Sequence, residues 1–382
     1  MSYLVEETNQ LLASYRSVRQ TTDRIVAPLS PEDCMVQSME DASPTRWHMA
    51  HTTWFFETFV LKTLPEYKVL NPKFNFLFNS YYNSIGEQFP RPQRGLISRP
   101  GLKEVRGYRD HVDRHMTELL ESGHVDDALE RVIKVGLHHE QQHQELILTD
   151  IKHALACNPT LPAYNDSPLK PNSHPLDNWI AIESGVYEIG FEGKGFSFDN
   201  ESPRHDTYIQ DCEISTKLVT CGDYLTFIED GGYSRPEYWL SLGWSAVQAN
   251  HWDAPLYWMK KEDRWFCFTL AGLKEINKEW PVCHLSYFEA DAFARWSGHR
   301  LPTEFEWEVA ERSWAEKPNP SHFNEEPFVD VLLSQNHAIH PTQNPKGLMG
   351  SVWQWTSSSY SAYPGYRPPD GAIGEYNGKF MS

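Results

Sequence analysis

The sequence predicts a helical bundle followed by an α+β domain. Long segments with apolar residues at helical spacing fill the first part of the chain. A stretch with five prolines interrupts this pattern, and short apolar runs broken by Gly, Asp and Pro follow it. We therefore expect a first domain at residues 1–156, a Pro-rich linker at 157–177 and a second domain at 178–382.

Composition limits the possible partners and compartment. The 382 residues carry a formal net charge of -18, which argues against a nucleic acid or an anionic membrane surface as partner. Six scattered cysteines include no CxxC pair, a pattern typical of reduced thiols in a cytoplasmic protein. No run of about eighteen apolar residues occurs, so we expect no membrane span.

Four helices are expected in the first domain, over about 3–27, 43–64, 102–121 and 126–155. Ser43 suits a helix cap and Pro44 suits a first turn. The aromatic, Pro-rich segment 65–101 is expected to be mostly loop. Four helices with a long crossover after the second predict a helical bundle.

The second domain shows weaker periodicity. Residues 179–182 and 212–215 are short apolar runs, and 350–356 is expected to be a strand of the core. Only 220–229 and 286–296 have a helical pattern. We therefore expect an α+β domain with much irregular structure.

A pair of histidines in the last helix of the bundle suggests a metal site. His139 and His143 are four residues apart, so both imidazoles leave one face of the helix and can reach one ion. A third ligand is expected from the second helix. His51 is preferred to His48 because it lies deeper in the apolar stretch. The alternative for either is a core histidine bonded to the backbone.

The metal itself is open at this point. The pattern HExxH at 139–143 also occurs in zinc peptidases, where Glu is the general base, but Leu146 and Thr149 replace the Gly and His of one common continuation. Three imidazoles leave three open positions on an octahedral ion, which suits an Fe(II) that binds substrate and O2 together. Residue types alone leave iron and zinc both possible.

Several segments resemble one two-domain family. Residues 47–57 (WHMAHTTWFFE) and 139–145 (HEQQHQE) resemble the DinB-like domain of ergothioneine-type sulfoxide synthases, the hercynine oxygenase family. Residues 198–205 (FDNESPRH), 298–308 (GHRLPTEFEWE) and 350–356 (GSVWQWT) resemble a formylglycine-generating-enzyme/sulfatase-modifying domain. The resemblance implies a DinB-like four-helix bundle followed by a C-type-lectin-like domain.

The same resemblance implies an activity. In this family one non-haem Fe(II) is held by three histidines, which correspond to His51, His139 and His143. The enzymes use O2 to join a cysteine-type thiol, cysteine or γ-glutamylcysteine, to the imidazole carbon of hercynine (Nα-trimethylhistidine), and the product is a sulfoxide. The implied protein is an oxidoreductase with small-molecule partners. A variant reaction with plain histidine or a selenium donor belongs to the same class.

Residues of the loop after the second helix are implied to act on the thiol and O2. Tyr81 or Tyr82 corresponds to a phenol that donates a proton, with simple packing under the loop as the alternative. Arg91 and Arg94 resemble an arginine pair that binds the carboxylate of the thiol. Their alternative is a pair of solvent-facing charges.

Other residues are implied to contact hercynine. Gln142 resembles a residue that touches its imidazole. Trp353, Trp355 and Tyr360 are candidates to enclose the quaternary ammonium by cation–π contact, with structural packing as the alternative for the tryptophans.

The second domain is not expected to generate formylglycine, because no cysteine follows Cys283. We expect it to form one wall of the pocket instead. Relatives of the family usually continue past the position of Ser382. We therefore expect either a longer natural protein, whose core a further strand completes, or an exposed strand edge that another chain covers. Two other functions stay open: a zinc-dependent DinB-type thiol transferase or hydrolase, and a non-catalytic protein that binds hercynine or a thiol.

Overall fold

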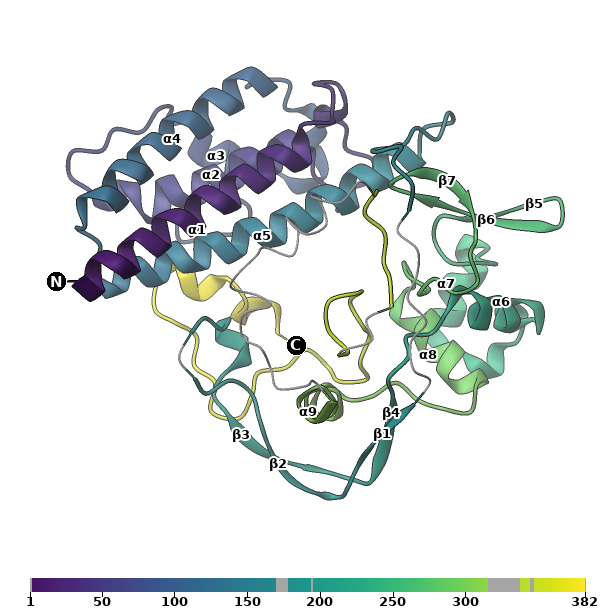
Figure 1. Ribbon diagram of the computed structural model, residues 1–382. Coiled ribbons are helices and arrows are strands. Elements are labelled where there is room, and N and C mark those ends of the chain that lie inside the picture. Colours follow the sequence, from purple (N-terminus) through teal and green to yellow (C-terminus); the bar gives the residue numbers. More distant parts are fainter. Residues whose placement is uncertain (1, 170–177, 194, 315–336, 344–346, 382) are drawn as a thin grey trace. The chain divides into compact units, whose positions relative to one another are not determined.

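The structure is a computed structural model that describes residues 2–169, 178–193, 195–314, 337–343 and 347–381 (Figure 1). Residues 2–164 together with 367–379 form one compact unit, and the described residues between 165 and 366, with 380 and 381, form another. The predicted linker lies outside the described residues at 170–177. Within the described ranges, no helix is long and apolar enough to cross a bilayer.

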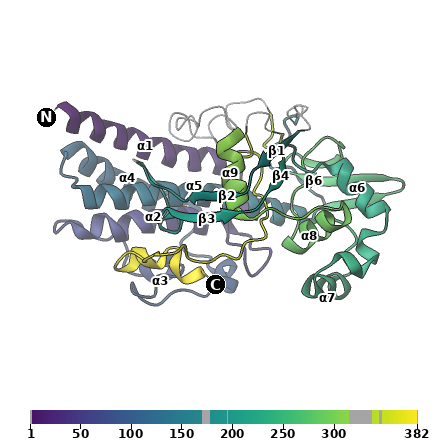
Figure 2. The same ribbon diagram turned by 90° about the horizontal axis from the view of Figure 1, so that it is seen from below.

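The first unit is a helical bundle, as the sequence predicts. Its long helices lie side by side in two views (Figures 1 and 2). They are α1 (Ser2–Val26), α2 (Thr45–Phe59), α4 (Leu102–Ser122) and α5 (Asp127–Ala156), and the short α3 (Phe74–Phe78) lies in the crossover. The second helix ends at Phe59 rather than near Leu64, where a 3₁₀ turn (Leu61–Thr63) follows it.

Local chemistry fixes how α5 begins and how closely it approaches α2. The Asp126 side chain accepts a hydrogen bond from the backbone N–H of Leu129 at 2.8 Å, which caps the helix. Gly136 faces two rings of α2: a Cβ there would lie 2.6 Å from Phe56 Cε1 and 2.9 Å from Phe55 Cε1. The missing side chain therefore lets the two helices approach closely, one turn before His139.

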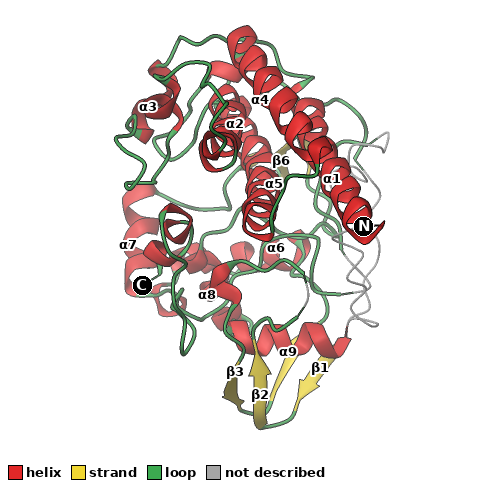
Figure 3. Cartoon of the chain, turned by 90° about the vertical axis from the view of Figure 1, so that its left-hand side faces the viewer, coloured by secondary structure: helices red, strands yellow, loops and turns green. Residues whose placement is uncertain are grey.

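The second unit contains small antiparallel sheets. In one, β1 (Trp179–Ile182) pairs with β4 (Cys212–Ser215), and in another β2 (Gly185–Ile189) pairs with β3 (His205–Ile209). A third sheet has the order β5 (Trp258–Lys261), β6 (Arg264–Thr269), β7 (Gly272–Glu275). Helix α9 (Glu304–Trp314) lies against β1, β2 and β3, and Val309 and Ala310 pack there on Ile182, Ile189 and Ile209 (Figure 3).

The other helices of this unit are α6 (Cys221–Glu229), α7 (Ser241–Asn250) and α8 (Tyr287–Trp296). Capping boxes start two of them, with Thr220 and Asp223 for α6 and Ser286 and Glu289 for α8. Together with α9, they confirm the predicted α+β class. The expectation of only two helices was wrong, because α7 and α9 are also present. Helix α7 begins without a side-chain cap and holds a glycine, so its sequence carries weak helical signals.

The predicted strand at 350–356 was also wrong, since the described residues there form no strand. Gly350 has φ +96°, a positive value that does not fit a residue within a strand. Side chains connect this segment to the rest of the unit. Gln354 accepts a hydrogen bond from Trp307 Nε1 at 3.1 Å, and Trp355 Nε1 donates to the Leu285 carbonyl at 3.0 Å.

Candidate metal centre

Three histidines from two helices of the first unit meet at one point. His51 comes from α2, and His139 and His143 come from α5. One nitrogen of each lies within 4.8 Å of the others, and all three residues are buried. The Nε2 atoms of His51 and His139 are 3.2 Å apart. Two nitrogens bound to one ion at about 2.1 Å are about 3.0–3.4 Å apart, so this spacing fits a shared metal.

Aromatic rings hold these imidazoles in place. The His51 ring stacks on Trp47 with a centroid distance of 4.7 Å and on Trp54 at 5.6 Å. The Phe55 ring lies 4.9 Å from the His139 ring. A shell of large buried rings leaves these imidazoles few alternative rotamers, so the constellation is preorganised.

The hydrogen-bond partner of one ring nitrogen indicates whether the other ring nitrogen of a histidine has a lone pair for a metal. His51 Nδ1 lies 2.6 Å from the Phe78 carbonyl, to which it can only donate, so its Nε2 keeps a lone pair. His143 Nδ1 lies 2.8 Å from His48 Nδ1. His139 Nδ1 is buried and has no hydrogen-bond partner among the described residues. The nitrogen of His139 that faces His51 is its Nε2, so the short contact between these two residues joins Nε2 to Nε2.

Burial keeps these imidazoles neutral. It lowers the pKa of His139 to about 3, and it also lowers the pKa of His51 and of His143 well below the usual value. The neighbouring histidines act in the same direction on His51 and His143. Neutral imidazoles offer the lone pairs that a divalent ion requires. The donor set therefore fits a borderline ion such as Fe(II) or Zn(II).

His48 lies next to this group and not in it. Its Nε2 is 3.0 Å from the Asp150 carboxylate, and its Nδ1 faces His143. The structure thus brings His51, the preferred third histidine, to the other two.

The glutamate of the HExxH pattern is directed into an ion-pair network. Glu140 is fully buried, and its carboxylate accepts from Arg19 Nη1 at 2.7 Å, Thr22 Oγ1 at 2.7 Å and Arg109 Nη2 at 3.2 Å. Burial raises its pKa, yet the two guanidiniums outweigh this effect and hold the pKa below its usual value. A carboxylate held by these three donors is not positioned as the general base of a zinc peptidase.

Arg91 and Arg94 differ in burial and in their hydrogen-bond partners. Arg94 is buried, its guanidinium carbon lies 3.4 Å from the Trp47 ring centroid, and its nitrogens donate to the hydroxyls of Ser43 at 2.9 Å and Ser80 at 3.2 Å. Burial lowers the pKa of Arg94 to about 9. Arg91 is exposed and donates to the Asp41 carbonyl. Arg94 is therefore the member of the pair that lies beside the ring packed on His51.

The tyrosines proposed as acids form a stacked pair. The rings of Tyr81 and Tyr82 are 4.6 Å apart, and Tyr82 is fully buried. Burial raises the pKa of Tyr81 to about 12 and also raises the pKa of Tyr82 well above its usual value. Both phenols are consequently protonated at neutral pH and able to donate.

Tyr376 is a residue of this region that the sequence analysis did not identify. Its ring is buried and lies 5.6 Å from the His139 ring, and its hydroxyl donates to Gln142 Oε1. Gln142, predicted to touch a substrate imidazole, is exposed on α5. No spacing rule connects Tyr376 to the histidines, because 234 residues separate it from Gln142.

The segment that carries Tyr376 is anchored to the crossover loop. The Glu375 carboxylate accepts from the backbone N–H groups of Asn83 at 2.9 Å and Ser84 at 3.0 Å. Burial opposes ionisation, yet the hydrogen bonds from Ser84 and Asn83 lower the pKa of Glu375 to about 2. Lys379 Nζ donates to the Tyr81 carbonyl. Residues 375–379 are therefore held against the crossover loop, and Tyr376 among them contacts His139.

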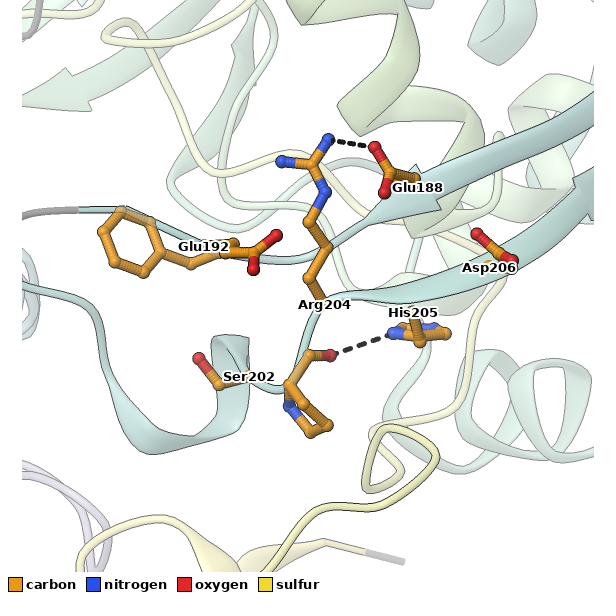
Figure 4. Close-up of a pocket in the computed structure, with 8 residues that line it drawn as sticks. Glu188, Glu192, Ser202, Arg204, His205 and Asp206 are labelled. Carbon is orange, nitrogen blue, oxygen red and sulfur yellow. Dashed lines mark hydrogen bonds and ion pairs between the residues drawn. The ribbon is translucent and has the colours of Figure 1, made fainter.

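Trp353, Trp355 and Tyr360 belong to the second unit and are exposed. That unit also has an open hollow of about 520 Å³, lined by carboxylates of Glu188, Glu192 and Asp206 around Arg204 (Figure 4). Arg204 Nη2 lies 2.9 Å from Glu188. The hollow contains none of the predicted site residues.

Comparison with known proteins divides the chain near residue 165, as the two units do, although residues 367–379 belong to the first unit. Residues 165–379 match the Sulfatase-modifying factor enzyme 1-like domain, and residues 14–147 match the DinB superfamily. The chain belongs to the sulfatase-modifying factor enzyme 1-like family. With the DinB domain ahead of it, the chain is a hercynine-oxygenase-like protein, which confirms the predicted family and domain order.

Three relatives illustrate the relationship. Hercynine oxygenase of Mycolicibacterium smegmatis is 28% identical over 85% of this chain and 78% of its own length. Hercynine oxygenase of Mycolicibacterium thermoresistibile is 26% identical over 85% and 74%. This hercynine-oxygenase-like protein is also similar to the Inactive C-alpha-formylglycine-generating enzyme 2 of Bos taurus, with 30% identity over 48% of the chain and 72% of that relative.

Proposed function

We propose that this protein is an Fe(II)- and O2-dependent oxygenase that joins cysteine or γ-glutamylcysteine to the imidazole carbon of hercynine and oxidises the sulfur to a sulfoxide. The observation that carries the proposal is the group of three buried, neutral histidines in a hercynine-oxygenase-like chain. The reaction is balanced by one O2. The thiol loses its S–H proton, the imidazole loses its C–H proton, one oxygen atom enters the sulfoxide and the other leaves as water.

In this proposal, His51, His139 and His143 hold the metal. Fe(II), when bound, supplies the one-electron chemistry that lets O2 react with a thiol. The protein's own task is to bring the thiol and the hercynine imidazole together, which removes the entropy cost of a many-body encounter. Burial of the site also excludes water that would compete for protons.

The carboxylate of the thiol substrate is assigned to Arg94, with Arg91 as its outer partner. Arg94 is held by Ser43, Ser80 and the Trp47 ring, so its guanidinium presents a preorganised fork to a carboxylate. Its lowered pKa does not remove the charge at neutral pH, because the value of about 9 lies above 7.

The proton donor is assigned to a phenol near the histidines. Tyr81 and Tyr82 are the candidates that the resemblance implies, and the ring contact with His139 favours Tyr376 as a third. Gln142, whose Oε1 accepts from Tyr376, is proposed to contact the hercynine imidazole. The cation–π roles of Trp353, Trp355 and Tyr360 stay predictions.

The deciding experiment assembles the protein, metal and substrates without oxygen and then adds O2. Metal-free protein is loaded with Fe(II), mixed with hercynine and either cysteine or γ-glutamylcysteine, and exposed to ¹⁸O2, and the products are analysed by mass spectrometry. We expect one product with the mass of both substrates plus one ¹⁸O and minus two hydrogens. Tightly bound zinc without O2 uptake would indicate the transferase or hydrolase alternative. Binding of hercynine or thiol without turnover would indicate a binding protein.

A further inference from the structure

A chain of polar side chains leads from His143 through the buried His48 to the partly buried Asp150. His143 Nδ1 lies 2.8 Å from His48 Nδ1, and His48 Nε2 lies 3.0 Å from Asp150 Oδ2. The same carboxylate oxygen accepts from the backbone N–H of Ser43 at 2.8 Å. His48 is 2% exposed. The three side chains therefore form one line, His143–His48–Asp150, that is fixed at its far end to the backbone.

The hydrogen-bonding capacity of each group determines where the protons are. An ionised carboxylate can only accept, so the hydrogen on the His48–Asp150 bond belongs to His48 Nε2. In the neutral ring, His48 Nδ1 then carries a lone pair. A lone pair facing His143 Nδ1 requires a hydrogen on that nitrogen, which leaves the lone pair of His143 on Nε2. The reverse arrangement would place a hydrogen on Nε2, where it would block a metal.

We propose that Asp150 and His48 are positioning residues that fix His143 in the tautomer whose Nε2 lone pair faces the metal site. This inference rests on the proposed metal centre. Carboxylate–imidazole pairs behind a ligating histidine act in this way in other metal sites, where they set the ring orientation and raise the basicity of the ligand.

The three histidines differ in what fixes their tautomer. His51 donates to the Phe78 backbone carbonyl, which no side-chain substitution removes. His139 Nδ1 has no partner in the described ranges. His143 depends on a side chain, so its tautomer can be changed without altering any of the three histidines. Ser43 also accepts from Arg94 through its hydroxyl, so one residue supports both the carboxylate of Asp150 and the guanidinium proposed to bind the thiol.

The test compares metal binding in two variants of His48, with Co(II) as a visible probe and metal-free protein as the starting material. His48→Phe fills the space and removes the acceptor, and we expect about 10–100-fold weaker Co(II) affinity. His48→Gln can accept from His143 through its carbonyl and donate to Asp150 through its amide, so we expect an affinity within about threefold of wild type. His138→Phe, one residue before His139, is the control and should bind Co(II) like wild type.

A second measurement does not depend on a variant. In ¹⁵N-histidine-labelled, metal-free wild-type protein, NMR should show His143 protonated at Nδ1 and His48 protonated at Nε2. A His143 protonated at Nε2, or a folded His48→Phe protein with wild-type Co(II) affinity, would overturn the inference. If His48→Phe does not fold, the wild-type spectrum decides. The predicted tautomers in a protein that makes no sulfoxide would leave the inference standing and refute the proposed function.

Discussion

Arg19 Nη1 lies 2.7 Å from Glu140 Oε2, and both side chains are almost completely buried. Glu140 directly follows His139, yet its carboxylate joins α5 to α1 and α4 through Arg19 and Arg109. The two histidines on either side of it in the HExxH pattern lie on a neighbouring face of the helix, where they meet His51. One helix turn thus presents a metal-binding face and a structural ion-pair face.

Glu140→Gln should destabilise the protein without acting on the chemistry directly. The substitution leaves two buried guanidiniums without their shared counter-charge, and breaking such a pair costs about 3–5 kcal/mol. Urea unfolding of the metal-free protein measures this loss. The matched control is Glu118→Gln, whose exposed partner Arg114 lies 3.5 Å away, and there we expect less than about 1 kcal/mol. Wild-type stability in Glu140→Gln would contradict the structural role.

His51→Ala should abolish iron binding, because two imidazoles remain from a site that needs three. Metal analysis after reconstitution should show one iron in the wild-type protein and almost none in the variant. Far-ultraviolet circular dichroism should show that the helices persist. His138→Ala, at the position before His139 in α5, is the control and should retain iron. Full iron occupancy in His51→Ala would show that His48 or another residue is the third ligand.

Local sequence patterns predicted the part of the site that lies within one helix. Because His139 and His143 are four residues apart, they lie on one face of the helix. The apolar residues around His51 predicted it, rather than His48, as the third histidine, and the structure places His51 with the other two. The long helices were predicted because apolar periodicity over many residues outweighs single unfavourable residues. The short α7 has too few residues for a clear apolar period. Packing of Val247 in the aromatic core stabilises this helix instead.

Contacts between distant segments could not be predicted in this way. Tyr376 reaches the histidines because Glu375 binds backbone N–H groups of the crossover loop, an interaction for which the sequence has no period. The same applies to the partners of Glu140, which are spread over α1 and α4. The position of Gly350 at φ +96° likewise depends on tertiary packing, so a strand pattern there was misleading.

The metal-free protein should lose stability as the pH falls below about 6.5. In the unfolded chain the pKa of His139 is near the ordinary histidine value of about 6.5. In the folded protein burial lowers its pKa to about 3. Between these values the unfolded chain binds more protons, so stability is complete above pH 6.5 and decreases toward pH 3 by about 1.4 kcal/mol per pH unit for this one group. Urea unfolding at pH 7, 6 and 5 measures the slope. His139→Phe should show a shallower slope, and an equal slope would refute the assignment.

Arg94→Ala should raise the apparent KM for cysteine by roughly tenfold or more, since a charge-assisted hydrogen bond is worth about 1.5–3 kcal/mol. The KM for hercynine should change much less. Arg94→Lys keeps the charge but loses the planar guanidinium. Its KM for cysteine should therefore lie between the values for the wild-type protein and Arg94→Ala. The control is Arg99→Ala, because Arg99 is exposed and bonds to its neighbouring Ser98 carbonyl. Equal changes in both KM values would show that Arg94 supports the site as a whole.

The last prediction concerns the phenol that donates a proton. Replacement of the catalytic tyrosine by Phe should leave substrate binding intact and reduce sulfoxide formation by about 10²–10⁴-fold, the usual contribution of general acid catalysis. Oxidation of the thiol to a sulfinic acid should then dominate the products. Tyr81→Phe, Tyr82→Phe and Tyr376→Phe are compared by mass spectrometry, and the ring contact with His139 favours Tyr376.

Because the Tyr376 hydroxyl also donates to Gln142, its loss could act through the position of that amide. Gln142→Ala separates the two roles. If Tyr376 only holds Gln142, both variants should raise the KM for hercynine and neither should divert the product to sulfinic acid. If Tyr376 is the acid, only Tyr376→Phe changes the product ratio. Normal sulfoxide formation in all three Phe variants would place the acid elsewhere, with Tyr360 as the next residue to replace.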